Sequence, residues 1–176
     1  MKLIVNGVPH ELASGPLTPL LQVLREELGI TSPKAGCQQG GCGSCTVLVD
    51  GEPQRSCLLP LGSLDGAAIT TVEGISTNGT LAPVQAAFHE HYAAQCGFCT
   101  PGFLVAAHAL LERRPGATRE DVIEGLAGHM CRCTGYVKIV AAVEAAARGR
   151  IDVETAGPEP GATAEEPEVL VPGSPA

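Results

Sequence analysis

Residues 36–45 read Gly36-Cys37-Gln38-Gln39-Gly40-Gly41-Cys42-Gly43-Ser44-Cys45, and Cys57 follows in the next segment. The arrangement C-x4-C-x2-C…C is the signature of a plant-type [2Fe–2S] cluster, in which four thiolates converge on two irons. Glycines between the cysteines let the loop turn tightly and point N–H groups at sulfur. A structural zinc site is the alternative, but zinc ligands usually come as two short C-x2–4-C pairs. The pattern therefore favours a first cluster on Cys37, Cys42, Cys45 and Cys57.

A second group of four cysteines lies in the C-terminal half, as one C-x2-C pair and, further on, one C-x-C pair. Spacing alone leaves zinc, a cluster and a redox pair open. One pair comes just before the helix start at Thr100-Pro101, and the other just before Thr134-Gly135-Tyr136. Helix N-termini carry partial positive charge, which lowers thiol pKa values and stabilises an anionic cluster. We therefore expect a second [2Fe–2S] cluster on Cys96, Cys99, Cys131 and Cys133.

The N-terminal segment determines how the eight cysteines are interpreted. Met1–Val8 is too short and too quickly polar for an export signal, and no apolar run approaches the ~20 residues of a membrane span. In a reducing compartment, cysteines ligate metal more often than they form structural disulfides. We therefore expect a cytoplasmic protein with no membrane span.

The negative charge of the chain is concentrated at its C-terminal end. The formal net charge is −8, and residues 151–176 hold six acids, no base, five Pro and three Gly. Such a segment buries too little apolar surface to offset the entropy of ordering, which predicts a disordered acidic, Pro-rich tail at 151–176. An acidic chain with 3% aromatic residues also lacks the basic, stacking surface of a nucleic-acid binder.

Residue patterns divide the rest of the chain into two units and predict an α+β protein. Two hairpins, one helix and a last strand are expected over 1–76, with Cys57 on the strand after the second turn. Over 80–149 the apolar period becomes helical, with starts marked by Thr and Pro and a break at Arg114-Pro115-Gly116. This second unit is expected to be a small antiparallel bundle of four helices.

Three segments together resemble one family. Lys34–Val47, Gln95–Gly102 and Cys131–Tyr136 are similar to the small iron–sulfur subunits of the molybdenum hydroxylases, the family of xanthine dehydrogenase, aldehyde oxidoreductase and carbon monoxide dehydrogenase. The resemblance runs from about residue 2 to 147. It implies an N-terminal β-grasp plant-type ferredoxin domain and a C-terminal four-helix bundle domain, each holding one [2Fe–2S] cluster.

The resemblance also implies a function, that of a non-catalytic electron-transfer subunit. Electrons would pass from a molybdenum–pyranopterin centre in a large subunit through the helical-domain cluster and then the ferredoxin-domain cluster to FAD in a medium subunit. The complex would be a heterotrimer or a dimer of heterotrimers. By position in the family motifs, Gln95 and Cys133 would lie near the pterin of the partner subunit.

Two other functional classes remain open from the residues. One is a free-standing two-cluster electron carrier, and the other is a zinc or iron–sulfur structural module. The chain has no phosphate loop, no G-x-G-x-x-G and no Ser-His-Asp arrangement, so we expect no catalytic residues of its own. The substrate of a holoenzyme is not encoded here, since specificity belongs to the site where the substrate binds.

Overall fold

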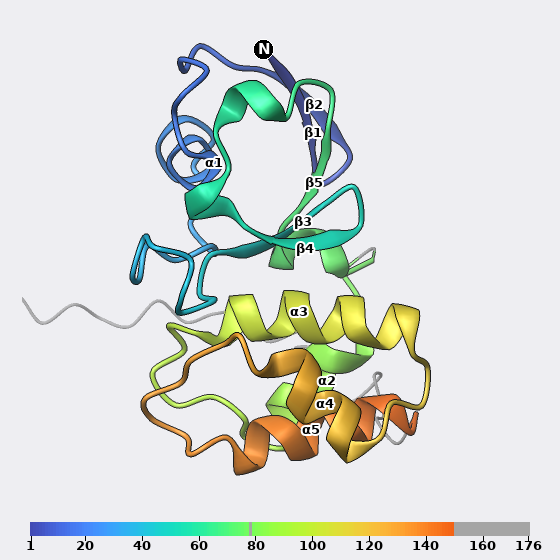
Figure 1. The fold of residues 1–176 in the computed structure, drawn as a ribbon. Coiled ribbons are helices and arrows are strands. Elements are labelled where there is room, and N and C mark those ends of the chain that lie inside the picture. The colour runs from blue at the N-terminus through green and yellow to red at the C-terminus, as the bar shows by residue number, and fades with distance from the viewer. Residues whose placement is uncertain (78, 150–176) are drawn as a thin grey trace, which may run out of the picture.

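The computed structural model describes residues 1–77 and 79–149, so the acidic tail expected at 151–176 lies outside the described residues. Figure 1 shows two units stacked on each other, a sheet unit that contains the N-terminus and a helical unit against its β3–β4 side. This mixture of sheet and helix confirms the predicted α+β character.

The first unit is a mixed five-stranded sheet with the strand order β2-β1-β5-β3-β4. β1 pairs antiparallel with β2 and parallel with β5, while β3 pairs antiparallel with both β4 and β5. The turn between β3 and β4 has positive φ at both Asp50 and Gly51, which is the backbone that Asp-Gly favours in a two-residue hairpin. Both predicted hairpins are confirmed. The strands are β1 (Lys2–Val5), β2 (Val8–Glu11), β3 (Thr46–Val49), β4 (Glu52–Arg55) and β5 (Ala68–Thr70).

A single helical segment covers the sheet of the first unit. It begins as α1 (Leu20–Gln22) and continues as a π-helical stretch (Val23–Glu27). Leu20 and Leu24 are fully buried against the sheet, as their helical spacing predicts. Short 3-10 helices at Ser56–Leu58, Leu61–Ser63 and Val72–Ile75 complete the unit.

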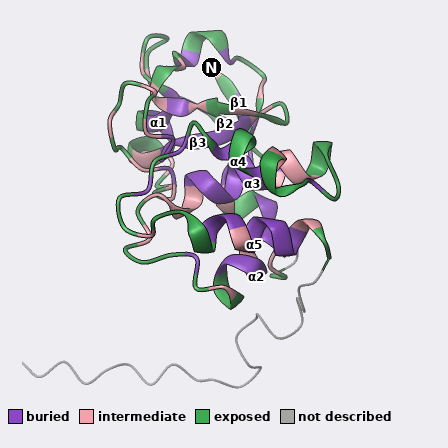
Figure 2. Ribbon diagram, turned by 60° about the horizontal axis from the view of Figure 1, so that its bottom comes forward, coloured by how far each residue is buried: buried purple, intermediate pink, exposed green. Residues whose placement is uncertain are grey.

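The second unit is built from α2 (Pro83–Glu90), α3 (Thr100–Arg113), α4 (Arg119–Leu126) and α5 (Val137–Ala147). The helical period predicts helices at 80–94, 101–113, 119–128 and 136–148, and each observed helix begins and ends within four residues of these bounds. α3 and α5 are the most deeply buried helices (Figure 2). Small alanines on both allow close approach, and the larger side chains Val84, Phe103, Val122, Ile139 and Val143 fill the core.

The two units meet along α3. Leu48 of β3 packs against Val105 and Ala109 of α3 in a small buried cluster. At the start of α3, a Cβ on Gly102 would lie 2.3 Å from the carbonyl oxygen of Gly43, so only glycine permits this approach. The helix and the loop of the first cysteine set are therefore in direct contact. No helix among the described residues is long and apolar enough to cross a membrane.

Candidate metal centres

The loop that carries the first cysteine set wraps around its own sulfur atoms. The N–H groups of Gln39 and Cys42 donate to Cys37 Sγ at 3.4 and 3.3 Å, and the N–H of Cys37 donates to Cys42 Sγ at 3.4 Å. Positive φ angles at Gln38 and Gly40 give the loop the curvature that brings these N–H groups inward. The N–H groups of the loop thus stabilise negative charge on the sulfurs of Cys37 and Cys42.

The other two cysteines of this set are held beneath the loop. Cys45 is buried, and its carbonyl accepts hydrogen bonds from the hydroxyl and the N–H of Ser56. This anchors Cys57, whose thiol contacts that of Cys45. The prediction that Cys57 lies on a strand was wrong, because β4 ends at Arg55 and Cys57 sits on the 3-10 helix that follows. The tighter turn brings the fourth sulfur back to the loop.

The thiols of the first set differ in acidity. The N–H of Gln39, followed by contacts from Cys42, lowers the pKa of Cys37 to about 6. Burial, followed by the contact with Cys45, raises the pKa of Cys57 to about 11. Since the thiolate is the ligand form, the N–H groups of the loop favour the charge state in which Cys37 can act as a ligand.

The second set is assembled from two loops. Cys133 Sγ lies 3.6 Å from Cys96 Sγ, and the thiol of Cys99 is near enough to that of Cys131 to have its pKa raised by it. The hydroxyl of Thr134 donates to Cys131 Sγ at 3.1 Å. All four cysteines of the predicted set are therefore brought together.

Acidity differs within the second set as well. The N–H of Phe98 lowers the pKa of Cys96, whereas burial raises the pKa of Cys99 to about 12. Burial also acts to raise the pKa of Cys131, but hydrogen bonds from Thr134 outweigh it and the pKa is lowered. Cys99 is the N-cap of α3, one residue before Thr100, which the sequence pattern predicts as the cap. Cys133 is further from a helix, because α5 begins only at Val137.

Tyr136 is a site residue that sequence reasoning missed. It adopts a left-handed conformation with φ of 68°, which is unfavourable for a bulky side chain. In this conformation its hydroxyl accepts the N–H of Cys131 at 3.0 Å, and its ring packs edge-on against the buried Phe103 at 6.3 Å. Tyr136 thus fixes the loop of the second cysteine pair to the core.

The donor sets fit [2Fe–2S] clusters. Among residues 1–77 and 79–149, no three Cys, His, Asp or Glu side chains are grouped to hold a single metal ion. In the first set, Cys37 and Cys42 are joined by N–H···Sγ hydrogen bonds in both directions, and the thiol of Cys57 lies near that of Cys45. Two thiolates on each of two irons is the ligation that such a cluster needs. A Cβ on Gly36 would lie 2.9 Å from Cys42 Sγ, so the loop also leaves no room for bulk beside that sulfur.

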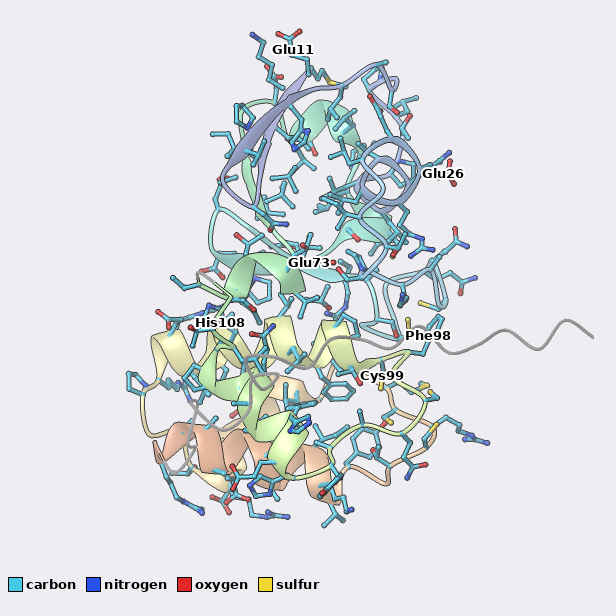
Figure 3. All side chains as sticks on the ribbon, turned by 180° about the vertical axis from the view of Figure 1, so that it is seen from behind. Glu11, Glu26, Glu73, Phe98, Cys99 and His108 are labelled. Atoms are coloured by element: carbon cyan, nitrogen blue, oxygen red, sulfur yellow. The ribbon has the colours of Figure 1, made fainter. Side chains whose placement is uncertain are left out.

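The two cysteine sets adjoin each other at the boundary between the units. The N–H of Met130 donates to the carbonyl of Cys42 at 2.9 Å, and Cys131 is the next residue. Figure 3 shows Phe98 and Cys99 at this boundary, and Phe98 contacts the first loop near Gly36. One hydrogen bond therefore joins the backbone of the first-set Cys42 to the residue that directly precedes the second-set Cys131.

His129 is the histidine nearest to the second cysteine set in the sequence. It is 8% exposed and packs on Phe103, with ring centroids 5.2 Å apart. Burial, followed by the charge of Arg55, lowers its pKa to about 4, so the ring is neutral. Its Nε2 lies 3.0 Å from the hydroxyl of Thr46, while its Nδ1 has no hydrogen-bond partner within the described chain. The ring therefore belongs to the boundary between the two sites and not to the surface.

The two residues expected near a partner's pterin lie on an open surface. Gln95 and Cys133 are both exposed, as is Cys96. The cysteines of the first set are less exposed. Leu58, which lies beside Gly40 of the first loop and is 57% exposed, marks the side on which this set is nearest to the surface. Each cysteine set therefore has its own accessible side.

Family models match both units. Residues 3–68 match a 2Fe-2S iron-sulfur cluster binding domain, and residues 71–144 match a [2Fe-2S] binding domain. The nicotine 6-hydroxylase small subunit of Paenarthrobacter nicotinovorans is 50% identical over 139 residues, covering 79% of this chain and 84% of that protein. The xanthine dehydrogenase iron-sulfur-binding subunit of Escherichia coli O157:H7 is 47% identical over 138 residues, covering 77% and 86%.

The chain belongs to the small iron–sulfur subunits of the molybdenum hydroxylases. A solved structure of quinoline 2-oxidoreductase from Pseudomonas putida 86 contains a chain of the same fold, with a TM-score of 0.79 and 43% identity over 86% of this chain and 97% of that one. Family membership confirms the resemblance drawn from the cysteine motifs, and with it two [2Fe–2S]-binding domains and the role of an electron-transfer subunit.

Proposed function

We propose that this chain relays single electrons between two [2Fe–2S] clusters, one on Cys37, Cys42, Cys45 and Cys57 and one on Cys96, Cys99, Cys131 and Cys133. When bound, each cluster takes up and releases one electron. The observation that carries the proposal is the contact between the two sets, where the N–H of Met130 binds the carbonyl of Cys42 at 2.9 Å. This contact brings the two cysteine sets next to each other, and a relay needs its two centres close together.

The accessible sides of the two sets support a direction for the transfer. We assign the exposed surface of Gln95 and Cys133 to a large subunit with a molybdenum–pyranopterin centre, which supplies the electrons. The exposed Leu58 beside the first loop marks the exit toward FAD in a medium subunit. The assembly is then a heterotrimer or a dimer of heterotrimers in the cytoplasm. The relatives named for single subunits of dehydrogenases and hydroxylases support this division of labour.

The domain organisation is part of the proposal. The sheet unit is a β-grasp domain over 1–76, and α2 to α5 form a four-helix bundle domain over 80–149. Separate buried cores support it, since one runs from Leu3 to Ile69 and the other from Ile75 to Ala146. Each cysteine set then lies at an edge of its own domain, and α3 joins the two.

Metal analysis of the purified full chain tests this function. We expect about four irons and about four acid-labile sulfides per chain, with two distinct electron paramagnetic resonance (EPR) signals after reduction. Zinc in place of iron would make the chain a structural module and overturn the proposal.

Co-purification tests the partners separately. Native protein should elute with molybdenum and flavin in fixed ratio to iron. Elution with four irons but neither molybdenum nor flavin would instead support a free-standing two-cluster carrier.

A further inference from the structure

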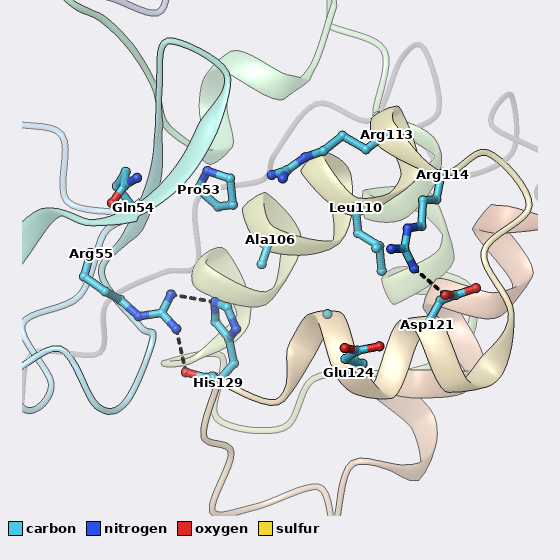
Figure 4. A pocket seen from close by; sticks show the side chains of 12 residues that line it. Pro53, Gln54, Arg55, Ala106, Leu110, Arg113, Arg114, Asp121, Glu124 and His129 are labelled. Carbon is cyan, nitrogen blue, oxygen red and sulfur yellow. Dashed lines mark hydrogen bonds and ion pairs between the residues drawn. The ribbon is translucent and has the colours of Figure 1, made fainter.

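Arg55 connects the two cysteine sites through neutral partners. Its Nε donates to the carbonyl of Gly40 in the first cysteine loop at 3.3 Å. Its Nη2 donates to the carbonyl of Gly128 at 2.6 Å, and its Nη1 donates to Nε2 of His129 at 3.1 Å, just before the second cysteine pair (Figure 4). Nη1 also donates to the hydroxyl of Thr46 in β3. One planar side chain therefore joins the first loop, the sheet and the second loop.

Within residues 1–77 and 79–149, the positive charge of Arg55 is not neutralised by a carboxylate. Two other arginines line the same cleft, which Figure 4 shows between β4, α3 and α4, and both are paired. Arg113 forms an ion pair with Glu52 at 3.2 Å, and Arg114 forms one with Asp121 at 2.5 Å. Among the described residues, no acidic side chain forms an ion pair with Arg55. Its charge is thus free to act on the groups on either side.

We propose that Arg55 is a positioning residue shared by both clusters, which holds the two cysteine loops together and raises the reduction potentials of both clusters with its unpaired charge. The inference rests on the proposed function, because it assumes that both sets carry [2Fe–2S] clusters. Arg55 contacts no cysteine side chain in the described chain, and it acts through Gly40, Gly128 and His129.

Two physical effects support this role. Reduction adds negative charge to a cluster, and a nearby cation stabilises that state more strongly where water is partly excluded. Arg55 is half-buried between the two cysteine loops, so water is partly excluded around its charge. Its guanidinium also presents donors in a fixed planar fork, so replacing it changes the distance between the loops as well as the charge. Lysine would keep the charge and lose the fork.

Three variants of the full chain separate these effects, each purified with any subunits that accompany it. In Arg55→Met, the ratio of reduced to oxidised cluster at a fixed potential should fall about tenfold for both EPR signals, which equals about 59 mV for a one-electron couple. Arg55→Lys should keep both midpoint potentials close to wild type and lower the melting temperature. Arg113→Gln is the matched control, since it removes a cation from the same cleft that is already paired, and it should leave both potentials unchanged.

Gly128→Ala tests the same charge without deleting it. A Cβ at Gly128 would lie 2.7 Å from Nη2 of Arg55 and would displace the guanidinium, so both potentials should fall, by less than in Arg55→Met. This variant decides the matter if Arg55→Met fails to load its clusters.

The role of Arg55 would be overturned by unchanged potentials in Arg55→Met or Gly128→Ala with about four irons bound. It would also be overturned if Arg55→Lys lowered both potentials as far as Arg55→Met does. Neither result would affect the proposed function, because the iron count and the two EPR signals of the wild-type chain establish that independently.

Discussion

The two cysteine sites of this molecule are assembled in different ways. In the first site, three cysteines share one loop, and backbone N–H groups of that loop already bond to Cys37 and Cys42. In the second site, Cys133 must meet Cys96 across 37 positions of sequence. The first site is therefore specified mainly by local backbone geometry, and the second by the packing of the helices that carry its loops.

This difference predicts how each site fails. A change within the first loop should damage one cluster and leave the helical unit intact. A change in the helical core should release the second cluster first, because nothing local holds its two pairs together. The boundary at Met130 and Cys42 is the place where damage to one site can reach the other.

Removing one buried ligand from each site is expected to have the largest effect. Cys45→Ser and Cys131→Ser should each lower bound iron from about four to about two per chain, because a serine hydroxyl is a poor replacement for a soft thiolate. Each variant should lose one EPR signal and keep the other. Iron analysis and EPR spectroscopy of the two proteins measure this, and loss of both signals from either variant would show that the sites do not assemble independently.

A cavity in the helical core is expected to have the second largest effect, because it should release the second cluster more easily than the first. Phe103 is 1% exposed and contacts both His129 and Tyr136, so Phe103→Ala should cost about 3–5 kcal/mol of unfolding free energy. The signal of the second cluster should disappear at lower denaturant than that of the first. Leu24→Ala is the matched control. It makes a cavity in the sheet core and should lower the unfolding free energy by about 2–5 kcal/mol, without causing the second cluster to be lost before the first. Simultaneous loss of both signals in Phe103→Ala would contradict the distinction.

A methyl group inside the first loop should have the opposite selectivity. In Gly36→Ala the added Cβ would lie 2.9 Å from Cys42 Sγ, so iron at the first site should fall several-fold while the second signal stays. Gly41→Ala is the control, because a Cβ there meets nothing within 4 Å. If the two variants gave the same spectra, the loop would be able to accommodate a methyl group beside Cys42 Sγ, contrary to this prediction.

Local signals in the sequence account for what could be predicted. The spacing of Cys37, Cys42 and Cys45 identifies the first site because its geometry is contained in one loop. Turn residues place the hairpins, and Pro101 places the start of α3, because these features depend on the conformation of a few neighbouring residues.

The parts that could not be predicted depend on tertiary contacts. Cys57 lies on a 3-10 helix because Ser56 anchors to the carbonyl of Cys45, a contact that no periodic pattern encodes. Arg55 and His129 belong to the sites because the two units meet, and Tyr136 positions Cys131 through its left-handed backbone and its packing on Phe103, none of which a sequence pattern shows. A motif lists ligands, and the residues that position ligands become visible only in three dimensions.

The smallest expected effect comes from a cap that touches neither site. Thr118 is the N-cap of α4, and its hydroxyl accepts the N–H of Asp121 while the Asp121 carboxylate accepts the N–H of Thr118. Thr118→Ala should cost about 1 kcal/mol and leave both EPR signals unchanged. Urea unfolding followed by spectroscopy measures this, and a shifted cluster signal would mean that the second site senses every change in helical stability.

The contribution of Asp121 to the stability of α4 depends on pH, because its carboxylate is part of the cap. The N–H and hydroxyl of Thr118 lower the pKa of Asp121, so its stabilising contribution is complete above the unfolded value of about 3.9 and is lost as pH falls through the folded value. The stability difference between wild type and Asp121→Asn should therefore be constant from pH 7 to about 5, since the carboxylate stays ionised throughout that range. Over this range the cluster signals of the two proteins should also match. A difference that grew on acidification would show that the carboxylate opposes folding, and the cap would then not stabilise α4 as its hydrogen bonds indicate.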